Sequence, residues 1–127
     1  FDAVLLDAPC TATGTMRRHP DLPFLKRARD IPAMAELQSA MLREAARLLA
    51  PGGRLVFATC SLQPEEGEAQ VPVAAAAGLV LDPVRPEELP GLTEAISANG
   101  TVRTRPDFWP ELGGLDGFFI ARFRRPG

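Results

Sequence analysis

The stretch Phe1-Asp-Ala-Val-Leu-Leu-Asp7-Ala-Pro-Cys10 decides the fold class, because an apolar strand in it runs directly into a sharp turn. Residues 3–6 are uninterrupted apolar residues, a pattern typical of a strand that is buried on both faces. Asp7 to Cys10 then ends the strand with a proline-containing turn. A second apolar strand is predicted over residues 54–59, and it too is followed at once by a cysteine, Cys60.

The segment between these two strands predicts a helix. Apolar residues recur there at helical spacing, from Pro32 in the first turn to Ala50. Pro51-Gly52-Gly53 ends the helix, because proline cannot continue it and glycine can adopt left-handed geometry. The residues that form the apolar stripe are Met34, Leu37, Met41, Ala45, Leu48 and Leu49.

The rest of the chain predicts one more helix and three short strands. Residues 64–68 are expected to start the helix, which Pro72 kinks or shortens. A short strand is expected at residues 79–81, and residues 101–104 and 117–123 are expected to form a terminal antiparallel pair. The pattern is that of half of an open α/β sheet.

Composition excludes several classes of protein. The 127 residues include two cysteines and one histidine, too few for a disulfide scaffold or a four-ligand zinc site, so we expect no metal. The net charge of −2 limits any contact with nucleic acid to a local patch. No apolar run reaches the roughly 18–20 residues of a membrane span. We therefore expect a cytoplasmic protein with no membrane partner.

Asp7, Cys10 and Cys60 all follow the carboxyl ends of strands, where open α/β sheets bind their ligands. The two thiols are therefore predicted to face one site. Position alone also allows each cysteine to be a small buried apolar residue, and Asp-Ala-Pro-Cys to be an ordinary turn. A redox pair is less favoured, because thioredoxin-type chemistry uses Cys-x-x-Cys.

A set of short motifs, in a fixed order, resembles the RNA (cytosine-5) methyltransferases of the Nop/Sun type, and among them the RsmB-like 16S ribosomal RNA methyltransferases. The resemblance covers nearly the whole chain. It departs from the usual pattern at Thr11, where a serine is more common. The motifs are Asp7-Ala-Pro-Cys10-Thr-Ala-Thr-Gly14, Arg17-Arg18-His19-Pro20-Asp21, Leu37-Gln38, Ala58-Thr59-Cys60-Ser61, Pro64-Glu65-Glu66 and Asp116-Gly117-Phe118-Phe119.

The resemblance implies a role for each residue of the site. Cys60 would attack carbon 6 of cytosine and so make carbon 5 nucleophilic toward the methyl group of S-adenosylmethionine. Cys10 would help to release the enzyme once carbon 5 has lost its proton. Asp7 would hold the edge of the base near N3 and N4. Arg17, Arg18 and His19 would contact RNA phosphate, although a solvated loop would have the same composition.

The resemblance also identifies what this sequence does not contain. There is no glycine-rich loop after a first strand, so the cofactor contacts would be limited to Asp7, Ala8 and Pro9, the edge of the S-adenosylmethionine site. We expect residues 1–127 to be the C-terminal portion of a Rossmann-like methyltransferase domain, without its cofactor-binding half and inactive alone. The alternative is a non-catalytic RNA-binding or assembly module with the same fold.

This interpretation makes two predictions about the sheet. In the usual methyltransferase order, the chain supplies strands four, five, seven and six, which are contiguous. The strand at residues 3–6 should then have one unpaired edge, and such an edge invites pairing with another chain. We therefore expect either self-association through this edge or a terminal segment folded over it.

Overall fold

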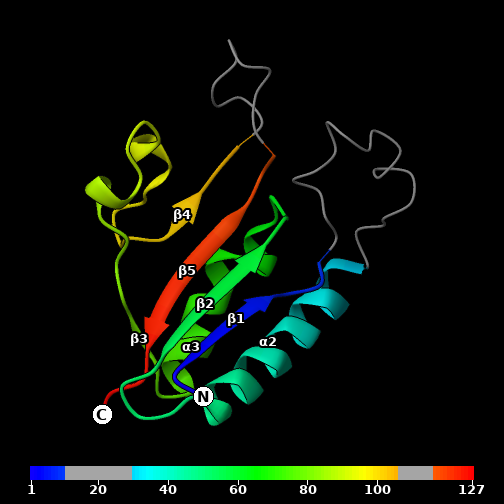
Figure 1. The fold of residues 1–127 in the computed structure, drawn as a ribbon. Coiled ribbons are helices and arrows are strands. Elements are labelled where there is room, and N and C mark those ends of the chain that lie inside the picture. The colour runs from blue at the N-terminus through cyan, green and yellow to red at the C-terminus, as the bar shows by residue number, and fades with distance from the viewer. Residues whose placement is uncertain (11–29, 106–115) are drawn as a thin grey trace.

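The structure, a computed structural model, describes residues 1–10, 30–105 and 116–127. In these residues, two helices and a five-stranded mixed sheet form a single α/β unit (Figure 1). The helices are α2 (Asp30–Leu48) and α3 (Val71–Ala76). The strands are β1 (Ala3–Asp7), β2 (Arg54–Thr59), β3 (Val80–Leu81), β4 (Val102–Arg103) and β5 (Phe119–Arg124).

The sheet has the strand order β1-β2-β5-β3, and β4 pairs with β5. β1 and β2 are parallel, with Ala3 opposite Arg54 and Asp7 opposite Ala58. β5 is antiparallel to β2, β3 and β4. The predicted contiguous order and the antiparallel terminal pair are both confirmed. Because β1 and β2 run in the same direction, the turns that follow them meet at the end of the sheet where the carboxyl ends of both strands lie.

The core lies between the two helices and one face of the sheet. Alternate residues of the central strands point into it, as the two-residue period of a strand requires. Phe57 of β2 and Phe119 of β5 are fully buried and meet edge to face, with ring centroids 6.4 Å apart. The other buried apolar residues of this cluster are Ala8, Leu42, Ala45, Ala46, Leu49, Leu55, Ala74, Leu79, Ala121 and Phe123.

The prediction that the first strand is buried on both faces is wrong. Val4 and Leu6 pack against the core, but Leu5 between them is 72% exposed. The reason is that neighbouring side chains of a strand point to opposite faces, and α2 and α3 cover only the face to which Val4 and Leu6 point. β1 is also the outermost strand, and among the described residues only β2 pairs with it. The predicted unpaired edge is thus present in this part of the chain, and self-association through it stays a prediction.

The second helix begins later than predicted. Residues 64–66 and 68–70 form two short 3-10 turns, and the α-helix starts only at Val71. Pro72 lies in its first turn, where the missing N–H of proline has no helical partner to lose. The first helix, by contrast, starts and ends within two residues of the predicted bounds. Gly52 follows it with a φ of 80°, as the predicted helix end requires.

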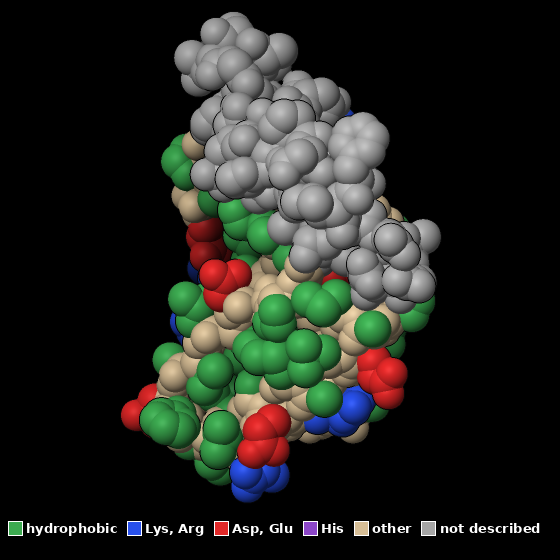
Figure 2. Space-filling model, turned by 90° about the vertical axis from the view of Figure 1, so that its right-hand side faces the viewer, with side chains coloured by type: hydrophobic (Ala, Val, Ile, Leu, Met, Phe, Trp, Pro, Cys, Tyr) green, Lys and Arg blue, Asp and Glu red, His purple; other side chains and the backbone are tan. Residues whose placement is uncertain are grey.

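Several large apolar side chains stay on the surface. Figure 2, which views the side of the molecule on which β1 and α2 lie, shows hydrophobic side chains gathered in the middle of that face. Leu37 and Leu48 of the predicted apolar stripe of α2 are 45% and 43% exposed. In the described ranges, neither helix is long and apolar enough to cross a membrane.

Candidate active site

The two cysteines lie together at the carboxyl ends of β1 and β2, as the sequence predicts. Cys10 comes three residues after the end of β1, and Cys60 follows β2 directly. Their Sγ atoms are 3.4 Å apart, and the two cysteines form no disulfide and are half-buried. The parallel register of β1 and β2 produces this meeting, because Asp7 pairs with Ala58 and both turns begin at the same level of the sheet.

The thiol of Cys60 ionises more readily than that of an ordinary cysteine. The hydrogen bond from Cys10 lowers the pKa of the Cys60 thiol to about 7. Burial and the negative charges of Asp7 and Glu66 oppose this lowering. An unperturbed cysteine has a pKa near 8.5, so a substantial fraction of Cys60 is thiolate, the nucleophilic form, at neutral pH.

Residues 59–61, here called the Cys60 turn, are held from two directions. From the following segment, the backbone carbonyl of Glu66 accepts a hydrogen bond from Thr59 Oγ1 at 2.9 Å, and Glu66 Oε1 accepts one from Ser61 Oγ at 2.8 Å. From β4, Arg103 donates to the backbone carbonyl of Ser61. Thr59, Ser61 and Glu66 are all fully buried, so these bonds are shielded from water.

Arg103 is itself held in place. Its guanidinium pairs with Glu68 at 2.6 Å and lies over the ring of Phe119, 5.2 Å from the ring centroid. Its side chain is only 17% exposed. The Cys60 turn is therefore bound to an arginine that has little freedom to move.

Residues 7–10, here called the Cys10 turn, are attached to β2 and α2. The N–H of Ala8 donates to the carbonyl of Ala58 at 2.9 Å, which continues the β1–β2 ladder by one residue. Gln38 of α2 donates from Nε2 to the carbonyl of Pro9 at 2.7 Å. The same nitrogen donates to Glu66 Oε2 at 3.0 Å, so Gln38 contacts the Cys10 turn directly and the Cys60 turn through Glu66.

The other predicted site residues are only partly placed. Asp7 and Pro9 are exposed at the edge of the sheet, whereas Ala8 is buried. A cofactor at this edge can therefore meet the Asp7 carboxylate and the surface of Pro9, but not the side chain of Ala8. Arg17, Arg18 and His19 lie outside the described residues.

The structural roles of Gln38 and Arg103 were not predicted from the sequence. For Gln38 a signal was present, since it lies four residues after Met34 and four before Leu42, on the apolar stripe of α2. A glutamine on a buried helical stripe needs hydrogen-bond partners, and here they are Pro9 and Glu66. For Arg103 no local signal exists, because its partners come from distant parts of the chain.

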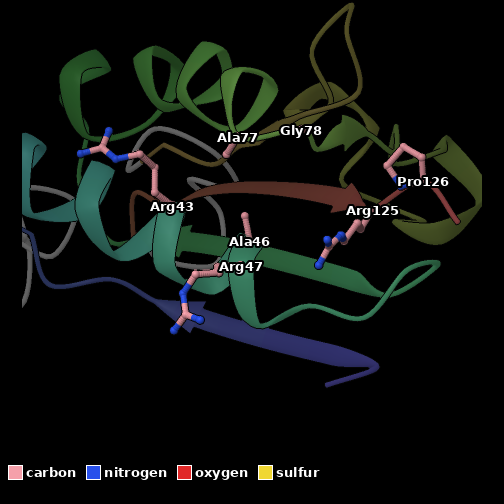
Figure 3. Close-up of a pocket in the computed structure, with 7 residues that line it drawn as sticks. All are labelled: Arg43, Ala46, Arg47, Ala77, Gly78, Arg125 and Pro126. Carbon is pink, nitrogen blue, oxygen red and sulfur yellow. The ribbon is translucent and has the colours of Figure 1, made fainter.

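A surface pocket at the opposite end of the sheet does not have the features of a reaction site. It is lined by residues from α2, from the segment before β3 and from the end of β5 (Figure 3). Its three arginines, Arg43, Arg47 and Arg125, do not converge on one point (Figure 3). In the described residues no cluster of three or more His, Cys, Asp or Glu side chains could hold a metal ion.

Comparisons with known proteins agree on one family. The profile of the family described as 16S rRNA methyltransferase RsmB/F matches residues 1–124. The ribosomal RNA small subunit methyltransferase B of Vibrio cholerae is 58% identical over 71 residues, which are 56% of this chain and 16% of that protein.

Two solved structures extend the likeness to the fold. The crystal structure of PH0851 covers 98% of this chain at 37% identity with a TM-score of 0.80, and the match is 26% of that protein. NSun6 from Pyrococcus horikoshii, solved with SFG, covers 97% at 34% identity with a TM-score of 0.72, and the match is 29% of that protein. The chain thus spans about a sixth to less than a third of these relatives.

Proposed function

The chain belongs to the RsmB/F family of 16S rRNA methyltransferases, and from this premise we propose that it carries the two catalytic cysteines of an RNA (cytosine-5) methyltransferase. The observation that supports the proposal best is the 3.4 Å approach of Cys10 Sγ and Cys60 Sγ at the carboxyl ends of adjacent parallel strands. Two reduced thiols at the carboxyl ends of these strands fit a reaction that uses one sulfur to attack and the other to assist departure.

Cys60 is the proposed nucleophile. Its thiolate adds to carbon 6 of the target cytosine, and the electron pair of the C5–C6 double bond then becomes available at carbon 5. The lowered pKa of the Cys60 thiol, about 7, supplies the thiolate at neutral pH. The hydrogen bonds of the Cys60 turn to Glu66 and Arg103 hold the backbone on either side of the sulfur.

Cys10 and Asp7 complete the proposed site. After carbon 5 has taken the methyl group and has given its proton to a solvent base, the electron pair of that C–H bond re-forms the C5–C6 double bond and Cys60 leaves as a thiolate. Cys10, 3.4 Å from the departing sulfur, assists its release. The Asp7 carboxyl is exposed at the end of β1, and its proposed role is to hold the base near N3 and N4.

S-adenosylmethionine supplies the methyl group when it is bound. The relative solved with SFG, an S-adenosylmethionine analogue, supports this cofactor. On this chain the residues that fit it are Asp7 and Pro9, exposed at the sheet edge, with the buried Ala8 contributing backbone only. We propose that the remaining contacts come from a part of the domain outside residues 1–127, and that these residues alone do not turn over.

The proposed substrate is ribosomal RNA, and the proposed compartment is the cytoplasm. The family name supports the RNA, and Arg17, Arg18 and His19 are the proposed phosphate contacts. The alternative, a non-catalytic RNA-binding module, would need neither ionised Cys60 nor a second thiol beside it. The paired thiols therefore favour the enzyme.

Covalent trapping separates these two functions. The full-length protein is incubated with S-adenosylmethionine and substrate RNA in which 5-fluorocytosine replaces cytosine. Fluorine at carbon 5 cannot leave as a proton does, so the enzyme stays bound to carbon 6 and migrates as a denaturation-resistant adduct. The same RNA with ordinary cytosine is the control. RNA binding without an adduct would support the non-catalytic module instead.

A further inference from the structure

Gln38 connects the two cysteine turns through one nitrogen atom. Its Nε2 donates to the carbonyl of Pro9, directly before Cys10, and to Glu66 Oε2. Through its other oxygen, Oε1, Glu66 accepts from Ser61, directly after Cys60. The path from one cysteine to the other therefore runs Cys10–Pro9–Gln38–Glu66–Ser61–Cys60, and we call its central pair the Gln38–Glu66 bridge.

The orientation of the Gln38 amide is imposed by these two acceptors. If the amide were turned over, its Oε1 would face the carbonyl oxygen of Pro9 and the carboxylate of Glu66. Both of these are acceptors, so neither could donate a hydrogen bond to Oε1. In the orientation present, Oε1 has no hydrogen-bond partner in the described part of the chain, although Gln38 is fully buried. A buried acceptor without a partner is costly, so the two bonds that Nε2 makes are what hold the amide in this orientation.

Gln70 provides a comparison within the same fold. It is also a buried glutamine that attaches α2 to a neighbouring segment, with Nε2 donating to the carbonyls of Ala35 and Glu65 at 3.1 Å each. Its Oε1 is paired, because Ser39 donates to it at 2.9 Å. None of these bonds involves a residue of either cysteine turn. Gln70 thus shows which hydrogen bonds a buried glutamine makes in this fold when its role is only to join two segments.

We propose that Gln38 and Glu66 are positioning residues that set the separation of the Cys10 and Cys60 sulfur atoms. Parallel pairing of β1 and β2 brings the two turns to one edge, and the bridge fixes how far apart their ends lie. The importance of this separation for catalysis rests on the proposed function. The separation itself can be measured without RNA or cofactor.

Dibromobimane measures whether the two thiols lie within bridging distance. Each thiolate displaces one bromide, and the product becomes strongly fluorescent only when both have reacted with one molecule of reagent. In the full-length protein, Cys10→Ala and Cys60→Ala identify the signal that belongs to this pair. We expect Gln38→Leu to slow bridging about tenfold or more, since a displacement near 1 Å has effects of this size. Gln70→Leu, the matched control, should leave the bridging rate unchanged.

Two further variants separate positioning from loss of fold. Gln38→Met keeps the length of the side chain and repeats the test if Gln38→Leu fails to fold. The exchange Gln38→Glu with Glu66→Gln restores an amide–carboxyl bond between the two positions but places a carboxyl oxygen against Pro9. We expect the exchange to recover thermal stability, while bridging stays slow and kcat falls with KM unchanged.

The outcomes are distinct. Equal bridging rates in the wild type, Gln38→Met and the exchange variant would overturn the proposal, as would equal slowing by Gln70→Leu. Normal bridging with no methyl transfer or adduct in the wild-type protein would instead count against the proposed function and leave the bridge intact.

Discussion

The two cysteine turns are held in different ways, although they follow neighbouring parallel strands. The Cys60 turn is bound on both sides of its cysteine. Thr59, before Cys60, bonds to Glu66. Ser61, after Cys60, bonds to Glu66 and to Arg103. In the described residues, the Cys10 turn is bound to β2 through Ala8 and to α2 through Pro9, and Cys10 itself meets Cys60. A nucleophile benefits most from a fixed position, because misplacement of the attacking atom raises the barrier directly. The bonds on both sides of Cys60 therefore support Cys60 as the attacking thiol.

The largest expected effect is the loss of the Cys60 thiol. Cys60→Ala in the full-length protein should lower the rate of methyl transfer by about 10⁴- to 10⁶-fold, the range for removing a catalytic nucleophile. The measurement is incorporation of labelled methyl groups into substrate RNA, with circular dichroism as the control for folding. Substantial methyl transfer by a folded Cys60→Ala protein would show that Cys60 is not the nucleophile.

Asp7→Asn should lower kcat by about 100-fold, because a carboxyl that takes part in proton transfer or charge stabilisation contributes at least this much. The reactivity of the Cys60 thiol should change in the opposite direction and increase. Cys10 lowers the pKa of Cys60 and the charge of Asp7 opposes it, so removing that charge lowers the pKa further. Iodoacetamide alkylation of Cys60 at pH 6 should therefore become faster while methylation becomes slower. A parallel loss of both would indicate a general disturbance of the site.

The dependence of Cys60 on Cys10 predicts a pH shift. Alkylation of Cys60 should rise with pH through a midpoint of about 7 in the wild-type protein. In Cys10→Ala the hydrogen bond that lowers the pKa is lost, and the midpoint should rise toward the ordinary value near 8.5. At pH 7 this means about tenfold slower alkylation. An unchanged midpoint would show that the Cys10 turn has no electrostatic influence on the Cys60 turn.

The smallest expected effect on chemistry comes from Arg103→Met. This change removes the hydrogen bond to Ser61 and the pairing with Glu68 but keeps much of the apolar contact with Phe119. We expect the free energy of unfolding to fall by about 1–3 kcal/mol, the range for hydrogen bonds to charged groups. Urea unfolding of Arg103→Met and of the matched surface variant Arg85→Met gives the comparison. Equal stability of the two proteins would show that β4 does not hold the Cys60 turn.

Much of the fold could be predicted because its signals are local. The apolar run of β2 lies between Gly53 and Cys60, and its predicted and observed bounds coincide. Proline and glycine at residues 51–53 likewise identify the end of the first helix within two residues. The later start of α3 was missed because Pro64 and Pro72 fit a helical first turn equally well, and only packing selects the second.

The site was predictable in its cysteines and not in what holds them. The position of Cys10 and Cys60 after two apolar strands is visible in the sequence, and parallel pairing makes them neighbours. The exposure of Leu5 was not visible, because an apolar run has the same pattern whether one face of the strand or both faces are covered. The pairing of β4 with β5 was predicted, but the contact of Arg103 with Ser61, 42 residues away, depends on where this pair lies relative to the Cys60 turn, which no local pattern contains.

The most direct test of the central claim is to compare covalent adducts in the two cysteine variants of the full-length protein. Each is incubated with unmodified substrate RNA and S-adenosylmethionine, and the mixture is resolved under denaturing conditions. Cys10→Ala should accumulate a slow-migrating protein–RNA band, because attack by Cys60 proceeds and release is slowed. Cys60→Ala should give none. The reverse pattern would exchange the roles of the two turns, and the absence of a band in both variants would contradict covalent catalysis by this pair of cysteines.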